Sequence, residues 1–320
     1  MRVVNYFDSD NKEHWLNEIR KGDWSAAAFL YELLSKGTFF DAVGENSGVL
    51  LLTDGDELIS FCTYAEKDDI QPTELTPWIG FVYTFPKHRG HHYVSLLMEE
   101  AERLAMKDGI SEVYISTNHI GLYEKYGCEF KTEMKDMNGE LSRVYVKKIP
   151  KDELLIELQD TEWTFEYTDH DRRIARAIVY DDDGYFYFVR AERDDDFGRA
   201  TLIETSGGGV EPGEDLNTAI RRELKEELGA DVRVVRRIGV VSDHYNLIHR
   251  HNLNNYFLCK VISFGDKHLT QDEIEDFHLS TLKLTYDEAI AEYEKRRETK
   301  LGRLIANREL PILRKARELM

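Results

Sequence analysis

The feature that most constrains this chain is a glycine-rich turn that runs directly into a strongly acidic stretch with helical spacing. Residues 208–230 read GGVEPGEDLNTAIRRELKEELGA. Their apolar residues recur every four positions, at Leu216, Ile220, Leu224 and Leu228. This spacing predicts a helix that begins near Asp215 and buries one apolar stripe. The helix therefore needs a second layer of structure to pack on.

Three glutamates lie on one flank of the same predicted helix. Glu226 and Glu227 follow Glu223 by three and four residues, so they fall within about 60° of it around the helix axis. Two like charges about 4 Å apart repel by roughly 4 kcal/mol at an effective dielectric near 20, and within the motif only Arg222 offsets them. A bound cation would remove the conflict. Carboxylate oxygens select Mg²⁺ or Mn²⁺, which bridge carboxylates to substrate phosphates, so the pattern indicates phosphoryl chemistry.

The glycines before the helix support this interpretation. Gly207, Gly208 and Gly209 allow the backbone to approach a metal or phosphate without a Cβ in the way, and Gly213 allows the turn into the helix. The alternative is a solvated helix face laced with Arg–Glu pairs, which is common on helices. The upstream Gly and Glu in register favour the metal site.

Residues 208–230 resemble the Nudix box, the pattern G-x5-E-x7-R-E-U-x-E-E-x-G-U in which U is a bulky aliphatic residue. The matching residues are Gly208, Glu214, Arg222, Glu223, Leu224, Glu226, Glu227 and Gly229. Ala230 is smaller than the last aliphatic residue usually is. The resemblance covers the second half of the chain. It implies an α/β/α sandwich that hydrolyses a nucleoside diphosphate linked to another moiety.

The resemblance also implies roles for single residues. Glu223, Glu226 and Glu227 would bind the metal, Arg222 would orient the glutamates, and one glutamate would be the base for the attacking water. The metal would polarise the phosphoryl oxygens and stabilise the leaving charge. Related proteins often add a downstream glutamate as ligand or base. The candidates are Asp272, Glu273, Glu275 and Asp276, with Glu273 favoured, and the alternative for each is an ordinary surface acid.

Substrate contacts are expected from a polar loop predicted at residues 242–255. Its side chains include His244, Tyr245, His249, Arg250 and His251, which can stack on a base or contact phosphate; the alternative is that most are plain polar loop residues. We take Tyr245 and Arg250, together with the glycines 207–209, as substrate-binding candidates. By the resemblance, a tyrosine at 245 favours a dinucleotide type over an ADP-ribose type. Residues 194–205 lack the extended signature of CoA-cleaving relatives.

The remaining second half shows mainly strand patterns. Residues 174–180 and 185–189 flank the turn Asp181-Asp182-Asp183-Gly184 and predict a hairpin. Further strands are expected at 201–205, 232–241 and 254–262. The tail from 286 to 320 is predicted to be helical and broken near Pro311.

The first half alternates helical and strand-like segments. The spacing predicts helices at 11–21 and 24–36, and two strands, 48–53 and 57–64, that meet at an Asp-Gly turn. An apolar stretch at 78–85 then leads into a basic, His-rich turn, a helix, and a short strand at 112–116.

The His-rich turn carries a second resemblance. Residues 82–97, VYTFPKHRGHHYVSLL, resemble the acyl-CoA-binding strand, loop and helix of GNAT acetyltransferases, whose core is R/Q-x-x-G-x-G/A. Aligned on Arg89 and Gly90, His92 stands where the first glycine is usual and Val94 stands at the second position. Those glycines let backbone N–H groups close around a pyrophosphate at a helix N-terminus, so larger residues would crowd that cradle.

A second segment, 118–127, resembles the N-x-x-A-x-x-L-Y-E-K-x-G-F segment of the same family. It implies that Tyr123 protonates the departing CoA thiolate and that Asn118 contacts the cofactor; the alternative for Tyr123 is a packed aromatic residue. The basic turn suits an anionic ligand in an acidic protein. The expected acetyl-CoA contacts are Val82, Thr84, Arg89, Gly90, His91, His92, Tyr93, Val94 and Asn118.

Length and composition set the frame for both halves. A chain of 320 residues is long enough for two domains, and we place the boundary near Pro150, with a GNAT-like domain at 1–149 and a Nudix domain at 150–320. The predicted fold class is α/β and α+β: a GNAT-like mixed sheet with helices, then the Nudix α/β/α sandwich. A net charge of -19 disfavours general nucleic-acid binding, which leaves small-molecule substrates as the expected partners.

Location and redox state follow from what the sequence lacks. No stretch approaches the roughly 18 apolar residues of a membrane span, and the first residues have no signal-peptide core, so a cytoplasmic protein is expected. Cys62, Cys128 and Cys259 have no zinc or disulfide spacing and are expected to be reduced and mostly buried.

Three functional hypotheses remain. In the first, both halves are catalytic, as a Nudix pyrophosphohydrolase and an acetyl-CoA-dependent acyltransferase. In the second, the first half is a non-catalytic sensor of CoA or nucleotide. In the third, the whole chain is a regulatory binding protein.

Overall fold

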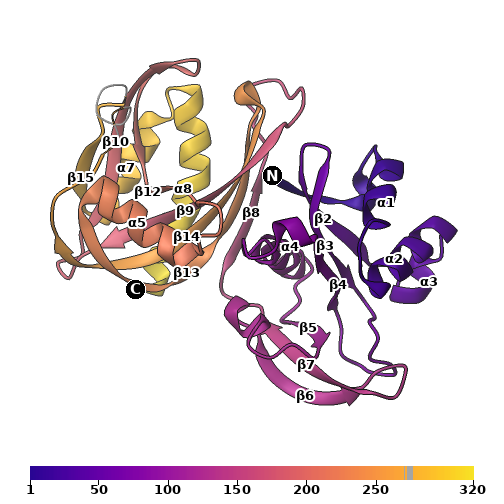
Figure 1. Ribbon diagram of the computed structural model, residues 1–320. Helices are drawn as coiled ribbons and strands as arrows, with labels where there is room; N and C mark the ends of the chain where they lie inside the picture. Colours follow the sequence, from indigo (N-terminus) through magenta and orange to yellow (C-terminus); the bar gives the residue numbers. More distant parts are fainter. Residues whose placement is uncertain (270, 272–276) are drawn as a thin grey trace. The chain divides into compact units, whose positions relative to one another are not determined.

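The computed structural model describes residues 1–269, 271 and 277–320 (Figure 1). They form two compact units, Met1–Lys151 and Asp152–Met320. The acids Asp272, Glu273, Glu275 and Asp276, proposed above as additional ligands, lie outside the described residues. In the described part of the chain, no helix has both the length and the apolar character that a membrane crossing requires.

The first unit is built on a seven-stranded sheet with the order β1-β2-β3-β4-β5-β7-β6. Its strands are β1 (Arg2–Asn5), β2 (Gly48–Asp54), β3 (Glu57–Ala65), β4 (Trp78–Thr84), β5 (Glu112–Thr117), β6 (Glu129–Lys135) and β7 (Leu141–Lys148). All neighbours are antiparallel except β4 and β5, which pair in parallel through Trp78 and Tyr114. This pairing lies at the beginning of β4, and the pocket described below lies along the later residues of that strand.

Helices cover both faces of this sheet. They are α1 (Lys12–Ile19), α2 (Ser25–Lys36), α3 (Phe39–Val43) and α4 (Val94–Lys107), with short 3-10 turns η1 (Tyr6–Asp8), η2 (Pro86–His88) and η3 (Tyr123–Tyr126). Successive strand residues point to opposite faces, so Leu50 and Leu52 pack with α4 while Val49 and Leu51 pack with the first three helices. Figure 1 shows these two helical layers on either side of the sheet. A strand buried on both faces explains the continuous apolar run of β2.

The second unit is an α/β/α sandwich. In its described residues an eight-stranded sheet has the order β11-β10-β9-β14-β13-β8, with β12 paired to β9 and β15 paired to β10. The strands are β8 (Leu154–Leu158), β9 (His170–Tyr180), β10 (Phe186–Asp195), β11 (Gly198–Glu204), β12 (Ser206–Gly209), β13 (Ala230–Tyr245), β14 (Arg250–Phe264) and β15 (Ser280–Leu284). Helix α5 (Leu216–Leu228) packs on one face, and α7 (Tyr286–Arg296) and α8 (Lys300–Leu319) pack on the other (Figure 1).

The predicted fold class is confirmed, and most local predictions match the elements observed. The hairpin over residues 181–184 forms, with Phe186 paired to Tyr180. The three cysteines are free and buried. The mixed sheet of the first unit and the sandwich of the second therefore follow the sequence patterns closely.

Two predictions are wrong. Residues 242–255 are not a long loop, because β13 continues to Tyr245 and β14 starts at Arg250, leaving only the turn η4 (Asn246–Ile248) and His249 between them. The tail is not broken at Pro311, which lies inside α8; the break comes before Thr299, whose side chain caps α8 by accepting from the Gly302 N–H. Proline inside a helix costs about 3 kcal/mol. Burial of the neighbouring side chains Leu310, Ile312 and Leu313 stabilises the fold by roughly 1.5–3 kcal/mol each. Together they outweigh the cost of the proline.

Candidate functional site

Local sequence sets the orientation of α5, the acidic helix. The Asp215 side chain caps its N-terminus by accepting from the backbone N–H groups of Asn217 and Thr218, and Gly229 ends it in the left-handed conformation with φ 66°. The predicted apolar stripe faces the sheet, with Ile220, Leu224 and Leu228 buried. The acidic flank is thereby turned towards strand β12 and its glycines.

Arg222 is the centre of the acidic cluster. Its Nε and Nη2 donate to the two oxygens of Glu214 at 3.0 and 2.9 Å, and its Nη1 donates to Glu223 at 2.7 Å and Glu226 at 3.2 Å. Nη2 also donates to the Gly209 carbonyl at 2.9 Å. Hydrogen bonds to Arg222 lower the pKa of Glu214. One guanidinium therefore ties the glycine strand, the loop glutamate and two helix glutamates into a single unit.

Glu227 is held from the strand side. Its Oε2 accepts from the Ser206 hydroxyl at 2.5 Å and from the Gly207 N–H at 2.9 Å. Burial, together with the nearby charge of Glu223, raises the pKa of this carboxyl to about 8, although the hydrogen bonds from Ser206 and Gly207 act in the opposite direction. A divalent cation among these carboxylates would counteract both causes.

The glycines of β12 are needed for close packing. An ideal Cβ on Gly208 would lie 2.5 Å from Oε2 of Glu223. Gly207 has φ 141°, and a Cβ there would collide with the carbonyl oxygen of Ala175 on β9. Gly208 thus allows the Glu223 carboxylate to pack against the backbone of β12, while Gly207 allows β12 to pair closely with β9.

Within residues 1–269, 271 and 277–320, no group of three or more His, Cys, Asp or Glu side chains is arranged as a metal site. Instead, Arg222 bonds one oxygen of Glu223 and one of Glu226, and β12 bonds Glu227. The donor chemistry still fits a hard divalent cation, because the cluster consists of carboxylates and one of them is strongly disfavoured as an anion where it stands.

A cavity of about 300 Å³, which we call the arginine cavity, lies in the same unit. Two of its lining residues, Tyr245 and Arg250, are the substrate-binding candidates of the sequence analysis. His244, His249 and His251 are not part of its described lining. The lining residues are Arg172, Ile174, Arg176, Arg193, Phe197, Glu204, Tyr245, Ile248, Arg250, Asn252, Phe277, Leu301, Ile305 and Arg308.

A buried charged network includes two residues that line this cavity, Arg308 and Tyr245. Arg308, 1% exposed, donates to Asp243 at 3.3 Å, to the Tyr245 hydroxyl at 2.8 Å and to Glu309 at 2.9 Å. Glu309 is fully buried and also accepts from the Thr205 N–H at 2.7 Å. Apart from Tyr245, sequence reasoning missed this network, because β13 and α8, which carry most of its members, are far apart in the sequence and meet only in the folded domain.

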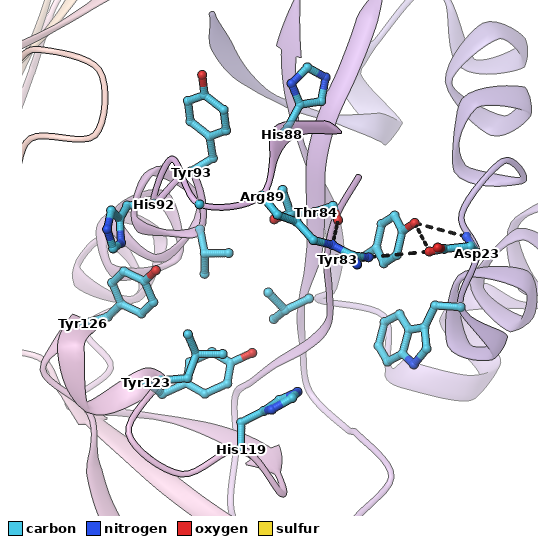
Figure 2. Close-up of a pocket in the computed structure, with 15 residues that line it drawn as sticks. Asp23, Tyr83, Thr84, His88, Arg89, His92, Tyr93, His119, Tyr123 and Tyr126 are labelled. Atoms are coloured by element: carbon cyan, nitrogen blue, oxygen red, sulfur yellow. Dashed lines mark hydrogen bonds and ion pairs between the residues drawn. The ribbon is translucent and has the colours of Figure 1, made fainter. Parts of the chain in front are cut away.

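The first unit has a larger pocket of about 690 Å³ (Figure 2). Of the residues expected to contact acetyl-CoA, those that line it are Val82, Thr84, Arg89, Gly90, His92, Tyr93 and Val94; Tyr123 lines it as well. His91 and Asn118 are not among its described lining residues. Unanticipated members include Asp23, Trp24 and Tyr83.

The turn before α4 keeps a glycine-like backbone despite its side chains. Gly90 has φ 89° and His92 has φ 58°, so His92 adopts the left-handed conformation at the place where the acyl-CoA motif has a glycine. Among the described residues, no side chain caps the N-terminus of α4. In this first turn the backbone N–H groups of Ser95 and Leu96 donate to the carbonyls of His92 and Tyr93 at 2.9 and 3.1 Å, and Tyr93 also lines the pocket.

The side chains of Tyr123 and Arg89, which both line the pocket, have different orientations and partners. Figure 2 shows the Tyr123 phenol pointing into the pocket, and burial raises its pKa, so it stays protonated at neutral pH. Arg89 is turned aside: its Nε donates to the Thr84 carbonyl at 3.0 Å, and its Nη2 lies 3.5 Å from Asp23. Asp23 in turn accepts from the Tyr83 hydroxyl at 2.5 Å.

Comparisons with known proteins address both units. The NUDIX domain model matches residues 170–300, and the model of the acetyltransferase (GNAT) family matches residues 13–128. No curated protein matches the chain.

Solved structures similar to either half share little sequence with it. A NUDIX hydrolase from Nitrosomonas europaea is 21% identical, with a TM-score of 0.35, over 43% of this chain and 87% of that one. An aminoglycoside 6'-N-acetyltransferase complexed with coenzyme A is 16% identical, with a TM-score of 0.34, over 47% of this chain and 98% of that one. By the two family matches, this chain joins a GNAT acetyltransferase domain to a NUDIX domain.

Proposed function

We propose that the NUDIX domain uses Mg²⁺ or Mn²⁺ to hydrolyse a nucleoside diphosphate linked to another moiety. The observation that carries this proposal is the set of carboxylates that Arg222 and β12 hold together beside Gly208. Buried, crowded carboxylates are unfavourable as anions, and a hard cation is the ligand that stabilises them.

The glutamates and the arginine of this cluster have separate proposed roles. Glu223, Glu226 and Glu227 would hold the cation, which when bound polarises phosphoryl oxygens and neutralises developing charge. Arg222 positions two of these carboxylates by direct hydrogen bonds. The Glu226 side chain is 39% exposed against 11% for Glu223, so it is the better placed of the two to take a proton from water.

The test uses the full chain with a panel of diphosphate-linked nucleosides and Mg²⁺ or Mn²⁺, with products identified by mass. We expect Glu226→Gln to lower kcat at least about 100-fold, as removal of a catalytic group does. Glu318→Gln, an exposed acid of the same domain, is the matched control and should keep full activity. Equal rates for wild type and Glu226→Gln would contradict the assignment.

We also propose that the GNAT domain binds acetyl-CoA in its pocket and transfers the acyl group to a small molecule. The uncapped N-terminus of α4 and the buried phenol of Tyr123 on the same pocket support this. Tyr123 would give its proton to the departing thiolate. In calorimetry, wild type and Tyr123→Phe should bind CoA alike, while transfer should fall about 100-fold or more in the variant.

A sensor without catalysis is the second candidate, and the observation that favours it is the side chain of His92 at the left-handed position of the cradle. CoA binding without transfer to any acceptor tested would support the sensor. Metal-dependent turnover by the NUDIX domain would exclude a purely regulatory protein.

A further inference from the structure

The arginine cavity concentrates positive charge in a protein whose net charge is -19. Its described lining contains a single acidic residue, Glu204. The same lining contains five arginines: Arg172, Arg176, Arg193, Arg250 and Arg308. The local excess of positive charge attracts an anion to the cavity, although the net charge of the whole chain is negative.

Three of these arginines already have carboxylate partners. Arg308 pairs with Glu309 at 2.9 Å, Arg176 lies 3.5 Å from Glu204, and Arg193 pairs with Asp195 at 2.5 Å. Arg172 and Arg250 form no ion pair with any described residue. The unbalanced charge of the cavity therefore resides on these two.

Arg250 is held in place while its donors remain available. Its guanidinium lies 5.5 Å from the centre of the Tyr245 ring, and its Nε is buried with no hydrogen-bond partner among the described residues. Burial, and then the charge of Arg172, lower its pKa to about 10, so it remains protonated at neutral pH. Nε of the fully buried Arg308 likewise has no partner in the described part of the chain. Buried charged donors without acceptors are costly unless a ligand supplies the acceptors.

Arg172 connects this cavity to the acidic cluster. An ideal Cβ on Gly209 would lie 3.4 Å from its Nη2, and the charge of Glu223 acts on its guanidinium. The same arginine lines the arginine cavity. Arg172 therefore lies beside the glycine strand that packs on Glu223 and also in the lining of the cavity, so the cavity borders the proposed hydrolytic site.

We infer that the arginine cavity, through Arg172 and Arg250, binds a further phosphate group of the substrate, separate from the diphosphate linkage that is cleaved. The inference rests on the proposed hydrolase function for the identity of the ligand as a substrate. Arginine matches phosphate because its planar fork donates two parallel hydrogen bonds. A neutral base against the apolar wall formed by Phe197, Ile248 and Leu301 would leave both arginines unpaired, and it is the competing outcome of the test.

The first experiment measures binding alone. Inorganic phosphate is titrated into the full chain without divalent metal, by calorimetry. We expect Arg250→Gln to weaken binding at least about 10-fold and Arg250→Lys to weaken it less, since lysine keeps the charge but not the fork. Arg233→Gln, an exposed arginine on β13, is the matched control and should bind as wild type does. Melting temperatures without phosphate identify any variant that fails to fold.

The second experiment compares substrates that differ by one phosphate: NAD⁺ with NADP⁺, and ADP-ribose with its 2'-phosphate. We expect at least a 10-fold higher kcat/KM for a phosphorylated member, lost in Arg250→Gln and kept in Arg233→Gln. If nothing is cleaved, the hydrolase proposal fails while the phosphate titration still decides this inference. Wild type that binds no phosphate, or binds it as Arg250→Gln does, overturns the inference.

Discussion

Gly208→Ala provides a direct test of whether Glu223 works from the position observed. The new Cβ would stand 2.5 Å from Oε2 of Glu223, whereas ordinary contact begins at 3.4 Å. The carboxylate must therefore retreat by about 1 Å, and a misplacement of that size at a reacting centre reduces rate about 100-fold. The displaced atom is the end of a flexible side chain, so the fold itself should lose little stability.

Two further variants separate this local effect from general damage. Gly207→Ala places its Cβ against the Ala175 carbonyl at φ 141°, so it should destabilise the whole domain. Gly265→Ala meets nothing closer than the Lys225 amine at 3.5 Å and should behave as wild type.

The assay combines metal-dependent hydrolysis with urea unfolding of the same preparations. Gly208→Ala is expected to keep the unfolding midpoint of the NUDIX domain and lose about 100-fold in kcat/KM. If Gly208→Ala retains wild-type kcat/KM, the close contact between β12 and Glu223 has no part in catalysis, and the reasoning from this geometry is refuted.

Three other predictions concern charge. Because the pKa of Glu227 is raised from 4.5 to about 8 on folding, its protonation stabilises the folded state below about pH 4.5, and this stabilisation is lost as the pH rises to about 8. Urea titrations of metal-free protein should show this fall in the free energy of unfolding. Glu227→Gln should abolish the pH dependence. Arg308→Met should destabilise the NUDIX domain by about 3–5 kcal/mol, measured by urea unfolding, because the buried Glu309 loses its nearer charged partner and keeps only Arg176 at 3.9 Å. Arg233→Met should change stability by less than about 0.5 kcal/mol. Chelation by EDTA should abolish hydrolysis without affecting CoA binding, and hydrolysis that persists at full rate would argue against carboxylates that hold a cation.

Local sequence alone was sufficient for the acidic helix. Its capping aspartate, its apolar stripe and the common flank of Glu223, Glu226 and Glu227 all follow from spacings of three and four residues, which a helix converts into neighbours whatever surrounds it. The hairpin at residues 181–184 was predictable for the same reason, since the turn chemistry lies within the segment. Both family assignments rest on such short-range patterns.

The tertiary structure alone decided the arginine cavity and the course of the last helix. Arg172 on β9, Arg250 on β14 and Arg308 on α8 meet because β9 and β14 are neighbours in the sheet and α8 packs across it, relations that no local spacing contains. Pro311 stays helical because packing on that sheet outweighs its local preference. Side chains close in sequence are placed by backbone geometry, whereas side chains far apart are placed by the order of strands and layers, and that order is a property of the whole fold.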